Sequence, residues 1–126
     1  MGAVEQMELI PSAREKDIEA AVHMLQVEYH QWVATVKVLN RLNELSPDQQ
    51  RKLSEYEVKI EVVKTTIEAI LDNEARDIIK HRYLKSGRRK NTVAQYRSIM
   101  SESTIDRRIE KGLLSVANTL KDCGII

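Results

Sequence analysis

Two runs of apolar residues at heptad spacing constrain the fold of this chain more than any other feature. In residues 18–39 and again in residues 53–70, the apolar positions recur at alternating steps of three and four. This period places one apolar stripe along an α-helix, through which long helices pack side by side. The first stripe consists of Ile18, Val22, Leu25, Tyr29, Trp32, Val36 and Leu39, and the second of Leu53, Tyr56, Ile60, Val63, Ile67 and Ile70. The two stripes predict two long helices.

The segment between the stripes predicts where these helices begin and turn. Ser46 supplies a hydroxyl N-cap, Pro47 suits the first helical position, and Gln49 completes a capping box. The first helix is expected to start at Pro11-Ser12. A turn near Leu45 is short, which favours an antiparallel hairpin.

The stripes can be buried in two ways. They can cover each other within one chain, or two copies can pair through them. Further apolar residues lie outside the stripes, at Ala21, Val33, Val38, Leu42, Val58, Val62 and Leu71. They give each helix more apolar surface than one neighbour covers, which favours pairing. We therefore expect the stripe residues from Ile18 to Ile67 to form an oligomer interface.

The second half of the chain predicts three shorter helices. The first runs from Glu74 to about Leu84 after an Asp72-Asn73 cap, the second from residue 91 or 92 to about Ile99, and the third from Glu102 to about Lys121 after a Ser101 cap. Tight connections between three such helices are typical of a helix-turn-helix unit. Gly112 costs roughly 1 kcal/mol relative to Ala inside a helix, so we expect it to pack closely against a neighbouring helix.

The net charge of +1 conceals a strong asymmetry between the two halves. Residues 1–73 hold 8 Lys and Arg against 13 Asp and Glu, a net of −5, whereas residues 74–126 hold 12 against 6, a net of +6. Such a split indicates a basic part that faces polyanions. The chain is therefore expected to be all-α, with a self-associating helical hairpin over residues 1–73 and a helix-turn-helix module over residues 74–126.

The final helix has an apolar side and a donor-rich side. At about 100° per residue, Thr104, Arg107 and Lys111 cluster opposite the apolar residues. The apolar side is formed by Ile105, Ile109, Val116 and Leu120. Arg and Lys bond guanine edges or phosphates, and hydroxyls bond either, so the donor-rich side has the chemistry to read a major groove. The alternative is an ordinary amphipathic surface helix.

A second basic cluster precedes the second short helix. Arg88, Arg89 and Lys90 are consecutive cations in an expected loop, where modules of this kind bind backbone phosphates. Thr92 and Arg97 extend the expected contact. The alternative is a solvated loop.

Several sequence segments in residues 74–126 resemble known families. Glu74-Ala-Arg-Asp-Ile-Ile-Lys-His-Arg-Tyr-Leu84 resembles the first helix of region four of bacterial primary sigma factors, and Ser101-Glu-Ser-Thr-Ile-Asp-Arg-Arg108 is similar to its recognition-helix entry. The stretch Gly112–Leu120, with a preceding helical arm, looks like the ArpU-type and RinA-type regulators of late transcription in phages of Gram-positive bacteria.

The resemblance implies a sequence-specific DNA-binding regulator of a phage or phage-derived operon, with RNA polymerase as a further candidate partner. By its pattern Ser101 caps the recognition helix, Arg108 contacts phosphate, and the remaining positions face the groove. These groove-facing positions are Ser103, Thr104, Arg107 and Lys111. The chain departs from the usual turn pattern, because Ala94 and Ser101 are seven positions apart instead of six and no Gly occupies the turn.

Other classes of function find little support. No apolar run reaches the roughly 18 residues of a membrane span and no signal-peptide layout is present, so a cytoplasmic location is expected. His23, His30 and His81 lack the spacing of metal ligands, and no phosphate loop or catalytic motif occurs, so we expect neither a metal, a cofactor nor an enzyme. Cys123 is expected to be semi-buried. The rival hypotheses are a DNA-packaging component like a small terminase subunit, and a protein–protein adaptor or anti-repressor that does not bind DNA.

Overall fold

The computed structural model describes residues 13–126, and all regular secondary structure in that range is helical. The expected all-α class is therefore confirmed. The first long helix consists of α2 (Glu15–His23), the π-helical segment η1 (Met24–Glu28) and α3 (Tyr29–Leu39); it is followed by α4 (Pro47–Glu68), α5 (Asn73–Ile79) with the π-helical η2 (Lys80–Lys85), α6 (Arg89–Tyr96) and α7 (Glu102–Asp122). The expected helix start at Pro11-Ser12 lies outside the described residues.

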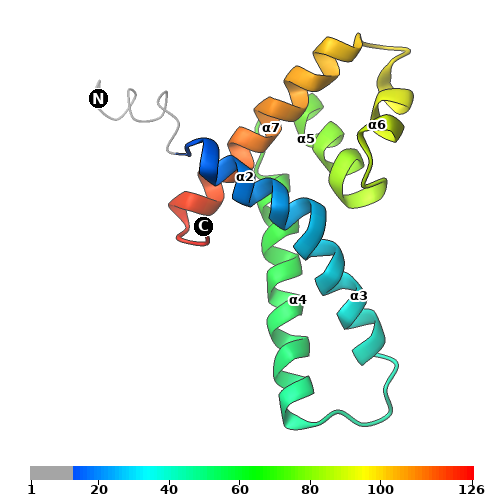
Figure 1. Ribbon diagram of the computed structural model, residues 1–126, viewed down its shortest axis with the longest axis vertical. Coiled ribbons are helices and arrows are strands. Elements are labelled where there is room, and N and C mark those ends of the chain that lie inside the picture. The colour runs from blue at the N-terminus through cyan, green and yellow to red at the C-terminus, as the bar shows by residue number, and fades with distance from the viewer. Residues whose placement is uncertain (1–12) are drawn as a thin grey trace.

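Helices α3 and α4 lie side by side, and together they extend away from α5, α6 and α7 (Figure 1). The predicted capping box begins α4: the Ser46 hydroxyl accepts a hydrogen bond from the Gln49 amide at 3.2 Å, and the Gln49 side chain accepts one from the Ser46 amide at 2.9 Å. This reciprocal pair satisfies two of the amides that a helix N-terminus leaves without partners.

The heptad stripes bury each other within one chain. Leu25 of η1 and Val63 of α4 are each 1% exposed, and Ile67 is fully buried. The other stripe residues are also buried or half-buried: Ile18, Val22, Tyr29, Trp32, Val36, Leu39, Leu53, Tyr56, Ile60 and Ile70. These residues therefore pack within one chain, and the expectation that two copies pair through them stays a prediction.

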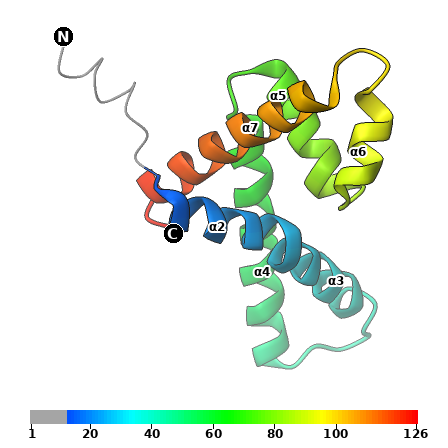
Figure 2. The same cartoon turned by 45° about the horizontal axis from the view of Figure 1, so that its top comes forward.

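Helix α7 contacts both long helices as well as α5 and α6 (Figure 2). Toward its C-terminus it meets the start of the first long helix, where the Ala13 amide donates to Asn118 Oδ1 at 2.7 Å and Lys121 Nζ donates to Asp17 Oδ2 at 3.1 Å. Nearer its middle it packs on α5. One hydrophobic cluster runs from Ala13 to Leu120, so residues 13–73 and 74–126 share a core.

Gly112 marks a close approach of α7 to α5. A Cβ atom at this position would overlap the side chain of Ile79 and would lie 3.5 Å from the backbone oxygen of Ala75. The expected close packing at Gly112 is confirmed. Because α7 rests on α5 at this point, its residues on the opposite side face outward.

Two local expectations were wrong. Helix α6 begins at Arg89, two or three residues early, and ends at Tyr96 instead of near Ile99. Ser86 closes the turn that precedes α6. Its hydroxyl accepts a hydrogen bond from the Arg88 amide at 3.1 Å, and Gly87, which lies between them, has a φ of 71°. Arg89 and Lys90 therefore lie in the first turn of α6. Cys123 is exposed, not semi-buried, because it follows the last turn of α7.

Candidate nucleic-acid interface

Three hydroxyls gather at the N-terminus of α7. Ser101 caps the helix, since its Oγ accepts a hydrogen bond from the Thr104 amide at 3.2 Å. The same Oγ lies 2.8 Å from Thr104 Oγ1 and 3.2 Å from Ser103 Oγ. Each hydroxyl can donate or accept, so this end of α7 presents donors and acceptors side by side.

Arg107 is the exposed guanidinium on the outward face of α7. Its Nη2 donates to Thr104 Oγ1 at 3.2 Å, and within the described residues no carboxylate forms an ion pair with it. A small pocket of about 190 Å³ lies beside it, lined by Thr104, Arg107, Arg108 and Lys111. The expected groove-facing residues therefore share one surface.

Two of the predicted DNA contacts are engaged with acidic residues. Lys111 Nζ lies 2.9 Å and Arg108 Nη1 lies 3.3 Å from Asp72 Oδ2, and Arg108 Nε donates to Glu74 Oε2 at 3.1 Å. Asp72 also caps α5 by accepting from the Ala75 amide at 2.8 Å. The Ala75 amide chiefly, together with Lys111, lowers the pKa of Asp72 to about 2. We call Asp72 and its two cationic partners the Asp72 clamp.

The Asp72 clamp predicts a loss of stability in acid. The pKa of Asp72 falls from 3.8 to about 2 in the folded chain, so its contribution is complete well above pH 3.8 and is lost as the pH falls toward 2. The pKa values of Asp17, Glu68 and Asp106 are shifted in the same direction. We expect Tm, followed by circular dichroism, to drop between about pH 4.5 and pH 2.

The variant Asp72→Asn keeps a side chain that caps helices but cannot titrate. Its Tm should therefore fall less over the same pH interval than that of the wild type. Equal falls in the two proteins would show that the Asp72 clamp contributes nothing to acid sensitivity.

Arg89 fixes α6 to α7. Its Nε donates to Asp106 Oδ1 at 2.9 Å, and its Nη2 donates to Asp106 Oδ2 and to Glu102 Oε1, both at 2.8 Å. The carboxylate of Asp106 chiefly raises the pKa of Arg89. This bidentate contact restricts the angle between the two helices. In the free chain, Arg89 therefore positions α7, with its Nε and Nη2 engaged by carboxylates.

Thr92 is not part of the exposed surface. Its side chain is fully buried, and its Oγ1 lies 2.9 Å from His81 Nδ1. The ring of His81 also meets Tyr96 edge-on, with centroids 6.0 Å apart. The expectation that Thr92 contacts phosphate is therefore corrected: it holds α6 against η2.

Three further predicted cations remain exposed around α6. Arg88 and Lys90 lie at its N-terminus and Arg97 follows its C-terminus. In the described part of the chain none of them forms an ion pair with a carboxylate. The sequence did not predict Asp72 and Glu74 as partners of the cations on α7. Asp72 gave a capping signal, but its other contacts depend on how α5 and α7 cross.

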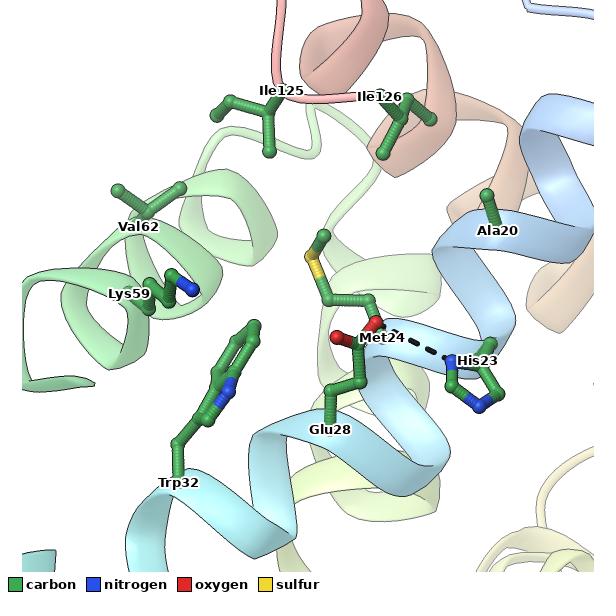
Figure 3. Close-up of a pocket in the computed structure, with 9 residues that line it drawn as sticks. All are labelled: Ala20, His23, Met24, Glu28, Trp32, Lys59, Val62, Ile125 and Ile126. Atoms are coloured by element: carbon green, nitrogen blue, oxygen red, sulfur yellow. Dashed lines mark hydrogen bonds and ion pairs between the residues drawn. The ribbon is translucent and has the colours of Figure 1, made fainter. Parts of the chain in front are cut away.

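A second surface lies beyond the other end of α7. Two adjoining apolar pockets, of about 620 and 610 Å³, share Val62 and Ile125 and form what we call the α4 groove. Figure 3 shows Met24 and Trp32 beside the first pocket, with Lys59 and Val62 across from Ile126. The remaining lining residues of the two pockets are Ala20, His23, Glu28, Glu57, Val58, Glu61, Thr65, Thr66, Ala69, Thr119 and Cys123.

Comparison with known proteins finds no matching family model, no matching curated protein and no matching solved structure. Within residues 13–126, no helix has the length and apolarity needed to cross a membrane. In the same range no group of three or more His, Cys, Asp or Glu side chains is placed to hold a metal ion.

Proposed function

We propose that this chain is a transcriptional regulator that binds duplex DNA by placing the N-terminal half of α7 in the major groove. The observation that carries the proposal is the exposed face on which Arg107 and three hydroxyls lie together, with exposed cations at both ends of α6. The sequence resemblance to ArpU-type and RinA-type phage regulators and to sigma region four supports the same role.

The packing of α7 suits it to enter a groove. Its apolar side rests on α5 at Gly112 and Ile79, and Arg89 fixes it to α6. A major groove admits an α-helix, and an arginine can bond guanine O6 and N7 there in a bidentate manner. In this account α5 with η2, α6 and α7 act as a helix-turn-helix unit, and Arg107 is its principal base-reading residue.

The cations around α6 are suited to phosphates. Arg88, Lys90 and Arg97 flank the reading face, where backbone contacts set the register of a protein on duplex DNA. Each phosphate neutralised adds about −0.9 to the slope of log affinity against log salt concentration. A duplex-binding role therefore predicts affinity that falls steeply with salt.

Fluorescence anisotropy of the full chain with a labelled pool of random-sequence duplexes tests this role. We expect saturable binding at ~50 mM salt. Between ~50 and ~200 mM salt, the affinity should fall with about the third power of the salt concentration, because several phosphates are contacted. Absence of binding at the lower salt concentration would reject the proposed function.

Dimerisation would place two readers on one site and raise affinity through effective concentration. We propose that the α4 groove carries this contact, since the heptad stripes are buried. Val58, Val62, Thr65 and Ala69 recur along α4 at steps of four, three and four, and they line the groove. In a twofold contact, the same surface of both copies meets. This row can line the groove of its own chain and also insert into the groove of the partner chain.

Val58→Lys should weaken self-association because it places a charge on this row. Val58 is 63% exposed, so the fold should tolerate the change. The matched control is Val38→Lys on α3, at a site 61% exposed and outside the groove. Sedimentation velocity should show monomers for Val58→Lys, whereas the wild type and Val38→Lys should sediment as oligomers. A wild-type chain that sediments as a monomer would contradict the proposal.

The α4 groove also supports a second candidate function, that of a protein–protein adaptor. Large exposed apolar patches mark interaction sites. An adaptor would dock an apolar segment in the groove and would not bind the duplex pool, whereas a ring-sized oligomer that binds DNA would favour a packaging component.

A further inference from the structure

An acidic side chain forms ion pairs with two of the cations that flank the proposed DNA-reading face. Resting on the proposed DNA-binding function, we infer that Asp72 is a specificity-determining residue. Its carboxylate stands where a DNA phosphate would bind Arg108 and Lys111, and so it opposes binding driven by charge alone.

The geometry of the Asp72 clamp supports a direct competition. Lys111 Nζ lies 2.9 Å and Arg108 Nη1 lies 3.3 Å from the same oxygen, Oδ2. Lysine and arginine bind carboxylate and phosphate oxygens through the same charge-assisted hydrogen bonds. Asp72 therefore competes with a phosphate for these donors and offsets part of the positive charge that the phosphate would meet.

Asp72 is held in place more firmly than its neighbour Glu74. Its other oxygen, Oδ1, accepts the Ala75 amide at 2.8 Å, and its side chain is 21% exposed. The Glu74 side chain is 57% exposed and contacts only Arg108 in the clamp. Asp72 thus persists as a competitor because capping α5 fixes its position independently of the cations.

The competition affects unspecific binding more than specific binding. Unspecific affinity comes from phosphates neutralised by any available cation, whereas specific affinity also includes contacts to base edges. Arg107 and Ser103 remain open to base edges while Arg108 and Lys111 are engaged. The Asp72 clamp therefore raises the ratio of specific to unspecific affinity.

The variant Asp72→Asn tests this inference because asparagine caps helices about as well as aspartate and carries no charge. Asp17→Asn is a matched control. Asp17 also accepts a backbone amide, that of Arg14 at 2.9 Å, and also pairs with a lysine of α7, Lys121 at 3.1 Å. Both variants change the net charge equally, but Asp17 lies near the C-terminal end of α7.

The three full-length proteins are titrated with random-sequence duplexes over a salt series, after circular dichroism has verified their folding. Asp72→Asn should bind about tenfold more tightly at ~0.1 M salt and steepen the salt slope by about one to two, because one or two more phosphates are neutralised. Asp17→Asn should keep the wild-type slope. The inference is overturned if the wild type binds and Asp72→Asn binds no better, or if both variants gain equally. No binding by any protein would overturn the proposed function itself.

Discussion

Replacing Arg107 by alanine should remove most of the sequence-specific DNA binding while leaving the fold intact. Arg107 is exposed, donates a hydrogen bond to Thr104, and lies opposite the buried face of α7. A bidentate arginine–guanine contact contributes about 1–3 kcal/mol of discrimination between bases. We therefore expect affinity for a duplex enriched from a random pool to fall about tenfold to a hundredfold, toward the affinity for unselected duplexes.

The matched control for this prediction is Arg88→Ala. Arg88 is also exposed and lies outside α7, so its loss should weaken binding to selected and unselected duplexes by similar factors. Gel-shift titrations of the three proteins with both kinds of duplex give the comparison. Unchanged discrimination in Arg107→Ala would show that Arg107 does not read bases.

The contact between Gly112 and Ile79 predicts the largest change in stability. Ile79 is fully buried, so Ile79→Ala should lower the free energy of unfolding by about 2–5 kcal/mol, through lost burial and a cavity. Gly112→Ala should also be destabilising. Its new Cβ overlaps the Ile79 side chain, and overpacking of about 1–3 kcal/mol outweighs the roughly 1 kcal/mol gained in helix propensity.

Combined, these two substitutions should be strongly non-additive. The cavity left by Ile79→Ala accommodates the Cβ of Gly112→Ala, so the second change becomes stabilising by about 1 kcal/mol in that background. Urea denaturation of the wild type, both single variants and the double variant measures the coupling. Additive changes within about 0.5 kcal/mol would contradict the packing of α7 on α5 described here.

The sequence predicted the positions of the helices better than it predicted how the helices pack. Heptad periodicity and the caps at Ser46 and Ser101 identified α4 and α7, and Gly112 correctly indicated a close approach. The same periodicity shows that a stripe needs a partner but not whether that partner is in the same chain. Within one chain the stripes pack against each other, and long-range packing with α7 adds to their burial, which no local pattern could predict.

The candidate site was predicted residue by residue but not in its interactions. Helical periodicity placed Arg107, Thr104 and Lys111 on one face, as the structure has them. The ion pairs of Arg89 and the burial of Thr92 depend on the crossing of helices distant in sequence, which no local pattern encodes. Asp72 was recognised as a helix cap, and its role beside the cations became visible only with α5 and α7 in place.

Amide chemical-shift mapping of the full chain with an enriched duplex tests the central claim most directly. If the N-terminal half of α7 enters the major groove, the largest changes should fall on residues 101–111, with further changes at residues 88–90 and 97. Changes concentrated on Val58, Val62 and Ile125 of the α4 groove, with residues 101–111 unaffected, would contradict the account.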